Sequence, residues 1–391
     1  LARNGSLEAA VRQLLTAGDT AEAADLIETW LPAAMGKAAW QTVQQLLLLL
    51  PQEVVLARPV LTLARAWLMV VMHRFDAIPG LVRQAQALLG QSVAAQGNRE
   101  PGWIEGWIDG LLSVVAFMEW RFAASLADSE SALAVLPAGH SYVRGIVIVY
   151  RTLALNALGQ TDAAMAGYAQ AMVTEQEDAQ YRVALAAGFM AQFGADLQAL
   201  GQVAGSFVNA SAEADQIGRL HAWGRLYLGI VAYERNNLAE AVEHFTSAFN
   251  RRLSTTAVIG VDSICGLALT YLALGDHERA AAWAATLLTA VSESQNGYYQ
   301  ALANWFACRL ALQRGTSATP PLSYLHVVGS MPSIQMRWSE LPDLTYARVL
   351  IAQGGKANLA DALALLNSLL DRARRHRFTW REVEVQAVRA L

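Results

Sequence analysis

Five side chains in three separate segments of the chain could together hold a small polar molecule. Trp223 and Tyr227 supply aromatic rings, and Asp262 supplies a carboxylate. Trp305 and Arg309 add a further ring and a guanidinium. Aromatic faces beside one acid and one arginine suit a sugar or an acidic metabolite, because rings stack on such ligands and charged groups orient them. We take these five residues as a candidate ligand-binding groove.

The grouping rests on helical periodicity counted back from predicted turns. Counting from the turn at Asn236 places Trp223 on one face of a helix, with Tyr227 beside it. The same counting in the next unit selects Asp262 and Cys265, and one unit later it selects Trp305 and Arg309. The alternative is that these residues pack between neighbouring helices, and the sequence leaves that choice open.

Motifs of known catalytic, metal or nucleotide sites are missing from the sequence. It contains no HExxH, GxSxG, GxGxxG or GxxxxGK[ST] pattern, and no two of its seven histidines lie three or four residues apart. The two cysteines, Cys265 and Cys308, form no metal-binding motif and fit two buried free thiols in a reducing compartment. We therefore expect a cytoplasmic protein that is not an enzyme and has no cofactor or metal.

Charge and hydropathy argue against nucleic acid and membrane as partners. The formal net charge is −4, and charged residues make up 16% of the 391 residues. The densest basic run, 371–381, is either a patch beside a DNA-binding domain or a solvated last helix, and its acidic neighbours favour the second. The most apolar long segment, 253–275, contains Asp262 and lacks aromatic belts, so we expect no membrane span.

Helix breaks recur along the chain at a period of about 40 residues. Glycine or asparagine interrupts an apolar helical pattern, and a second helix rich in alanine follows within a few residues. Six breaks fit this pattern, with spacings of 35, 42, 39, 40 and 39 residues: Gly159, Gly194, Asn236, Gly275, Gly315 and Gly354. Less regular breaks come earlier, near residues 18, 74 and 120. Each period therefore predicts one helical hairpin.

The residue types at each break explain the hairpin. Glycine and asparagine tolerate the left-handed conformation that ends a helix, and a following Asp or Thr can cap the next helix. Alanines then allow two antiparallel helices to approach closely, and stacked hairpins bury the remaining apolar faces. These features predict an all-α fold, a right-handed superhelix of tetratricopeptide-like helical hairpins.

The predicted array is a single domain covering residues 1–391. Its repeats are less regular in 1–100 and regular in 101–315, and a proline-rich, irregular insertion occupies 316–342. A C-terminal repeat follows in 343–391. Because the first residue is leucine, we expect the chain to come from a longer protein.

Several segments resemble a known family. The early motifs are Ala17-Gly18-Asp19, Leu50-Pro51, Arg58-Pro59 and Ala64-Arg65-Ala66-Trp67, and the late segment is YARVLIAQGGKANLADALALL. In this order they resemble the region that follows the nucleotide-binding domain in MalT-type, LuxR-class ATP-dependent transcriptional activators. The sequence departs from the pattern at Met72–Phe75, where such repeats usually read Gly-Arg or Gly-Asp.

The resemblance implies a regulatory function. It implies a sensor domain that binds an inducer, either a small molecule or a regulatory protein, and relays binding to ATPase and DNA-binding domains of the same full-length chain. The alternative is a protein-interaction scaffold of the tetratricopeptide type that holds a peptide or protein. The aromatic, charge-poor character of the candidate groove favours a small molecule.

Overall fold

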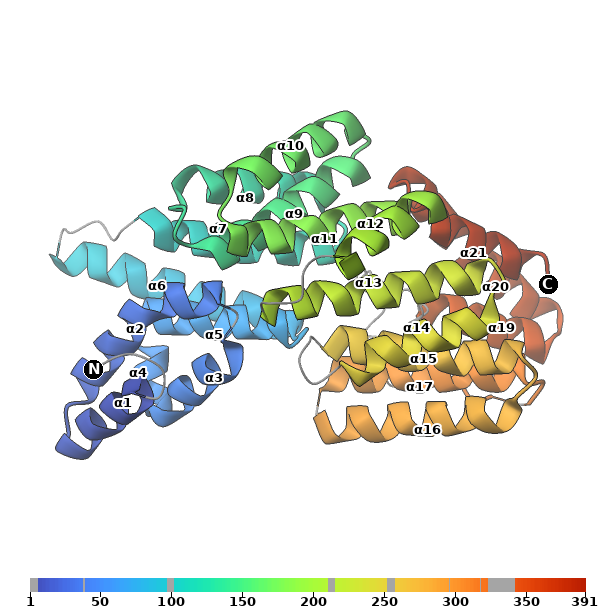
Figure 1. Ribbon diagram of the computed structural model, residues 1–391, viewed down its shortest axis with the longest axis horizontal. Helices are drawn as coiled ribbons and strands as arrows, with labels where there is room; N and C mark the ends of the chain where they lie inside the picture. Colours follow the sequence, from blue (N-terminus) through green and yellow to red (C-terminus); the bar gives the residue numbers. More distant parts are fainter. Residues whose placement is uncertain are drawn as a thin grey trace. The chain divides into compact units, whose positions relative to one another are not determined.

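The structure is a computed structural model that describes residues 6–37, 39–96, 102–209, 215–251, 257–294, 296–316, 318–322 and 342–391. All regular secondary structure in these ranges is helical, which confirms the predicted all-α class (Figure 1). Within the same ranges no helix has the length and apolar character needed to cross a membrane. Most of the predicted insertion at 316–342 lies outside the described residues.

The chain divides into two compact units. Unit 1 comprises Leu1–Phe117, Arg121–Leu155 and Asp162–Ala184. Its helices are α1 (Ser6–Ala17), α2 (Thr20–Gly36), α3 (Trp40–Leu49), α4 (Gln52–Leu56), α5 (Pro59–Val71), η1 (Phe75–Ala77), α6 (Ile78–Gln96), α7 (Gly102–Met118), α8 (Phe122–Val135), α9 (Ser141–Ala157), α10 (Thr161–Thr174) and the first part of α11 (Glu177–Phe193).

Unit 2 comprises Leu185–Leu391 together with two short turns, Met118–Trp120 and Asn156–Thr161. It contains the end of α11 and the helices α12 (Leu197–Asn209), α13 (Asp215–Glu234), α14 (Leu238–Asn250), α15 (Ala257–Ala273), α16 (His277–Ser294), α17 (Gly297–Gln313), α19 (Pro342–Gln353), α20 (Lys356–Arg375) and α21 (Thr379–Arg389). Consecutive helices of this unit pack against each other.

The structure has turns at the helix breaks that the sequence predicts. Gly159, Asn236, Gly275 and Gly354 each fall between two helices and have positive φ, from 61° to 84°. At many turns the next amide closes the helix by bonding to a carbonyl five residues back, as Asp276 N does to Tyr271 O at 2.9 Å. The period of about 40 residues is therefore a period of helical hairpins.

One marker residue differs from the prediction. At the second of the six predicted breaks the left-handed residue is Ala195, with φ of 57°, and not Gly194. The turn nevertheless closes as expected, because Asp196 N bonds to Ala191 O at 2.9 Å. Asp196 also caps α12 by accepting a hydrogen bond from the Ala199 amide at 2.9 Å, as predicted for an acid after the break.

Small residues let the hairpins of unit 2 approach closely. The ring of Phe245 on α14 is fully buried between two glycines of neighbouring helices. A Cβ added at Gly229 of α13 would lie 2.6 Å from Phe245 Cδ1, and one at Gly266 of α15 would lie 2.8 Å from Phe245 Cζ. Ala241 and Ala280 are also fully buried. The prediction that small residues set the helix spacing is confirmed here.

Unit 1 has its own aromatic core. The Trp67 and Trp107 side chains are fully buried, and the Trp67 ring meets the Tyr142 ring edge-on at 5.8 Å. Arg182 closes this core, because its guanidinium lies 4.7 Å from the Tyr142 ring centroid and donates to the Gly36 carbonyl at 2.9 Å. Arg182 thus satisfies the last carbonyl of α2, which has no partner in its own helix.

Candidate functional site

The five residues predicted to line a groove are buried. Their exposed fractions are 3% for Trp223, 0% for Tyr227, 0% for Asp262, 1% for Trp305 and 8% for Arg309. The prediction that they present a bare concave surface is therefore wrong. The alternative that the sequence left open, packing between neighbouring helices, is what the structure has.

The reason is visible in the partners of the two α13 rings. Trp223 meets the Phe189 ring of α11 edge-on, with centroids 5.5 Å apart and an interplanar angle of 89°. Tyr227 lies against the backbone of Gly188, where an added Cβ would come within 2.4 Å of the Tyr227 ring. Counting along a helix identified a shared face, but α11 covers that face.

Asp262 lies within electrostatic range of Tyr227, and both Asp262 and Arg309 lie within range of Cys265. Burial, with a smaller contribution from the Asp262 carboxylate, raises the pKa of Tyr227 well above its ordinary value. Burial and Asp262 also raise the pKa of the Cys265 thiol well above its ordinary value, and Arg309 opposes this shift. The polar groups therefore form a buried cluster between α13, α15 and α17, with Cys265 held as a neutral thiol.

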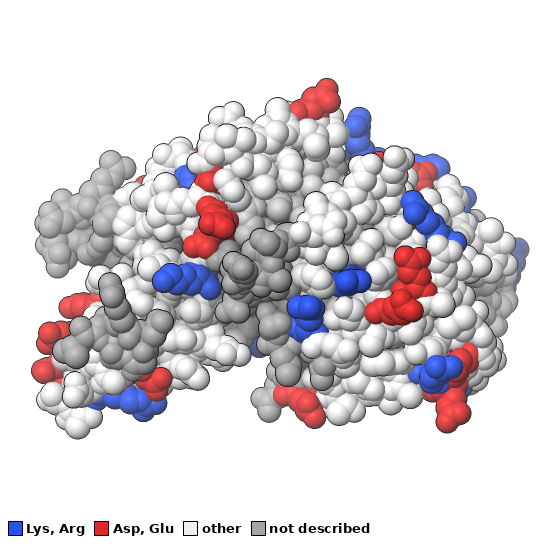
Figure 2. Space-filling model, in the orientation of Figure 1, with Lys and Arg blue, Asp and Glu red and all other residues white. Residues whose placement is uncertain are grey.

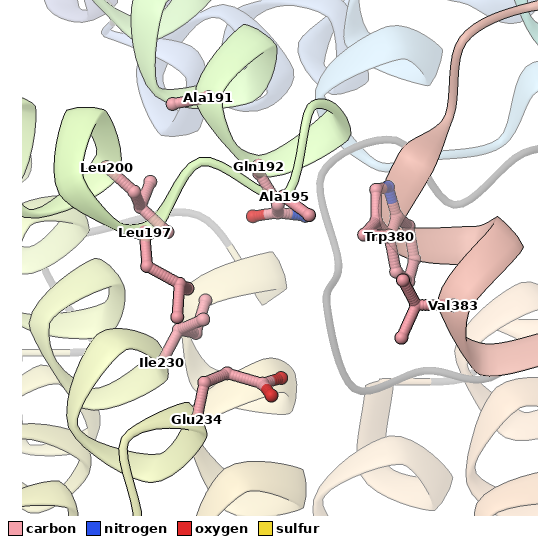
Figure 3. A pocket seen from close by; sticks show the side chains of 9 residues that line it. All are labelled: Ala191, Gln192, Ala195, Leu197, Leu200, Ile230, Glu234, Trp380 and Val383. Atoms are coloured by element: carbon pink, nitrogen blue, oxygen red, sulfur yellow. The ribbon is translucent and has the colours of Figure 1, made fainter. Parts of the chain in front are cut away.

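A pocket lies elsewhere in unit 2, at the turn between α11 and α12. Its cavity volume is about 100 Å³. Its walls come from the end of α11, the start of α12, the end of α13 and from α21, which lies far later in the chain. The lining residues are Ala191, Gln192, Ala195, Leu197, Leu200, Ile230, Glu234, Trp380 and Val383. Figure 3 shows Trp380 and Val383 across the pocket from Gln192, Leu197 and Ile230.

Gln192 is the polar centre of this pocket. Its side chain is 3% exposed, and neither the amide oxygen nor the amide nitrogen has a hydrogen-bond partner in the described part of the chain. A buried amide left unpaired costs about 1–3 kcal/mol of stability. Most other lining residues are apolar, and the charged one, Glu234, is exposed. The Gln192 amide is thus an unpaired polar group in an otherwise mostly apolar wall.

Aromatic packing positions the α21 wall. The Phe378 ring, which precedes α21, lies 4.8 Å from the Phe193 ring at the end of α11. The Trp120 ring lies 5.1 Å from Phe378, and Arg372 lies 4.9 Å above the Trp120 ring. The Arg381 guanidinium sits 3.6 Å from the Trp380 ring centroid. These contacts hold α21 beside the turn that carries Gln192.

Sequence reasoning missed Gln192 and Trp380. A single glutamine near the end of an apolar helix gives no periodic or motif signal. The closeness of α11 and α21 is a long-range contact, which helical periodicity does not report. The one available hint was the excess of tryptophan, which does not distinguish Trp380 from the ten others.

The two cysteines agree with their prediction. Cys265 and Cys308 are buried free cysteines, as expected. In the described ranges no group of His, Cys, Asp or Glu has the arrangement needed to hold a metal ion.

The basic run near the C-terminus is largely paired with acids. Arg374 lies 2.7 Å from Glu382, and Arg381 donates to Glu384 at 2.8 Å. The first pair links the end of α20 to α21, and the second lies within the first turns of α21. On the face shown in Figure 2, basic and acidic residues are scattered over a largely uncharged surface. This arrangement favours the interpretation of 371–381 as part of a solvated helix pair.

Comparison of the chain with models of protein families and with curated proteins gives no match. The relation to MalT-type regulators therefore stays an expectation from the resemblance of the motifs quoted above.

Proposed function

We propose that this chain is the sensor domain of a MalT-like, ATP-dependent transcriptional regulator, and that it binds a small-molecule inducer in the Gln192 pocket. The observation that carries the proposal is the buried, unpaired Gln192 amide in a pocket of about 100 Å³. Concave, mostly apolar sites with a few polar groups are typical of small-molecule binding. The proposal includes a right-handed tetratricopeptide-like superhelix, a cytoplasmic location, and ATPase and DNA-binding domains on the full-length chain.

The pocket also suggests how occupancy could be relayed. A ligand there would contact α21 on one side and the α11–α12 turn on the other. It would therefore bind more tightly when α21 is docked against that turn than when α21 is displaced. Such differential affinity is what lets a ligand shift a conformational equilibrium. In this scheme α21 is the element that reports the inducer to the rest of the regulator.

A ligand screen read by thermal stability and hydrogen exchange tests the proposal. At 100 times its dissociation constant a ligand should stabilise the protein by about 2.7 kcal/mol. We expect the same compound to slow amide exchange in α21. Val383 lines the pocket and is 59% exposed, so Val383→Trp should obstruct the site without disturbing the core. Val173→Trp, at an 82% exposed position of α10, is the matched control.

Two results would contradict the proposal. The first is a library of sugars, heterocycles and metabolites in which no compound stabilises the protein. The second is a stabilising compound that binds equally well to Val383→Trp and leaves exchange in α21 unchanged. A protein that is stabilised only by a peptide or protein partner would instead support the interaction scaffold.

A further inference from the structure

The pattern of unpaired atoms on Gln192 restricts the chemistry of the ligand. A glutamine amide presents an acceptor oxygen and a donor NH₂ side by side in one plane. Both atoms are buried and lack partners within the described residues. The group that satisfies both at once has an N–H donor next to a carbonyl acceptor, which is the edge of a cis-amide. Glutamine forms the same two-point contact with the donor–acceptor edge of adenine.

The rest of the lining excludes other ligand classes. An anion would meet the Gln192 oxygen and would have the Glu234 carboxylate nearby, and the described lining residues include no Lys or Arg. A hydrocarbon would fill the apolar volume but would leave the amide unpaired, at the cost described above. A neutral amide edge satisfies Gln192 and adds no buried charge.

Size and shape restrict the ligand further. A cavity of about 150 Å³ lined by apolar side chains accommodates a benzene molecule. This pocket is smaller, with about 100 Å³, and its lining residue Glu234 is exposed. It therefore admits one small ring or the edge of one. The indole of Trp380 and the side chains of Leu197 and Ile230 give that ring flat or apolar contacts.

We infer that the Gln192 pocket recognises a neutral, planar, single-ring ligand through a cis-amide edge, either a lactam or a ring-bound primary carboxamide. This inference rests on the proposed function and specifies the chemical class of its ligand. Gln192 pairs with the amide edge, Trp380 contacts the ring, and Glu234 lies at the mouth of the pocket.

Titration of small probes into the full chain tests the inference. The probes are 2-pyridone, its N-methyl derivative, benzamide and benzoate. The readout is the side-chain amide signal of Gln192 in ¹H–¹⁵N spectra, assigned by its loss in Gln192→Leu. We expect 2-pyridone to bind with a dissociation constant in roughly the millimolar range, as is usual for so few atoms. The N-methyl derivative lacks the donor and should bind about tenfold more weakly, the equivalent of one hydrogen bond.

The other probes and the variants distinguish a lactam ligand from a primary carboxamide ligand. Benzamide binding more tightly than 2-pyridone indicates a primary carboxamide, and the reverse order indicates a lactam. Gln192→Leu should abolish the discrimination between 2-pyridone and its N-methyl derivative. Gln198→Leu alters an exposed glutamine of α12 and should preserve that discrimination. Far-ultraviolet circular dichroism of both variants confirms that they are folded.

Three outcomes overturn the inference. They are equal affinity for 2-pyridone and its N-methyl derivative, tighter binding of benzoate than of both amides, and no change in the Gln192 signal up to the solubility limit of the amides. If another compound from the inducer screen still binds the pocket, the proposed function stands and only the ligand class fails. If Val383→Trp changes the affinity for no ligand of any class, both the proposed function and the inferred ligand class fail.

Discussion

At the scale of single residues, Gln192 links stability to binding. Its buried amide lacks partners in the described structure, so replacing it with an apolar side chain of similar size removes a cost rather than an interaction. We predict that Gln192→Leu raises the free energy of unfolding of the ligand-free protein by about 1–3 kcal/mol. Urea denaturation followed by tryptophan fluorescence measures the shift in midpoint.

The matched control for this prediction is Gln198→Leu, an exposed position on the next helix. It should change stability by no more than about 0.5 kcal/mol, as surface substitutions usually do. A clear loss of stability in Gln192→Leu would mean that the amide is paired in solution. The pocket would then have no unsatisfied group to offer a ligand.

A second residue-scale feature, in unit 1, depends on pH. The Trp107 indole N–H donates to His140 Nδ1 at 2.8 Å, and the Trp103 ring lies 5.0 Å from the imidazole. Burial lowers the pKa of His140 below its ordinary value of 6.5. A protonated Nδ1 could not accept the indole hydrogen. The neutral imidazole is therefore the form that the folded protein favours.

The sign of the resulting pH dependence follows from linkage. Because the pKa of His140 is lower in the folded than in the unfolded protein, its contribution to stability is present above about pH 6.5 and is lost as the pH falls through the folded value. We predict that His140→Gln, which keeps an acceptor but does not titrate, loses less stability than the wild type as the pH falls below 6.5. Urea midpoints measured across a pH series give this difference. Parallel curves for the two proteins would contradict the prediction.

At the scale of helices, the contact between α13, α14 and α15 depends on glycine. A Cβ at Gly266 would lie 2.8 Å from the buried Phe245 ring, so the ring or a helix would have to move. Overpacking of this kind costs about 1–3 kcal/mol, and we predict that loss of stability for Gly266→Ala. Gly201 of α12 is the control, because nothing lies within 4 Å of its added Cβ. Gly201→Ala should stabilise the protein by up to about 1 kcal/mol through helix propensity.

A double-mutant cycle identifies the cause of the Gly266 effect. If the clash with the ring is responsible, Phe245→Leu should cost less in the Gly266→Ala background than in the wild type. Additive effects would show that the alanine acts through something other than Phe245. Denaturation midpoints of the four proteins are sufficient for this measurement.

The helices also show what a sequence can predict. Turns that use Gly or Asn were located correctly, because those residues carry a local conformational preference. The left-handed residues Trp120, Ala195 and Arg377 carry no such preference, and each is followed by an amide that closes the helix on the carbonyl five residues back. The groove prediction failed for a related reason. Periodicity identifies which residues share a face of a helix, but it does not identify the helix that covers the face.

At the scale of the whole molecule, a turn far away in the sequence supports the candidate site. Residues 118–120 belong to unit 2, and the Trp120 ring lies beside His376 at 5.7 Å and Phe378 at 5.1 Å. These two residues join α20 to α21. The wall of the pocket that carries Trp380 is therefore anchored by a residue about 260 positions earlier in the chain.

This arrangement predicts that Trp120→Ala affects the pocket without touching it. Loss of the ring removes its contacts with Phe378 and with the Arg372 guanidinium, so α21 should open more often and its amides should exchange faster. Any ligand of the Gln192 pocket should bind more weakly, because part of its binding energy must restore the docked position of α21. Trp283→Ala is the control, since that ring contacts Phe249 of α14 at 5.2 Å and does not line the pocket. Hydrogen exchange of the α21 amides is measured in both variants and in the wild type. Equal protection of α21 in Trp120→Ala and in the wild type would contradict the prediction that Trp120 holds α21 in place.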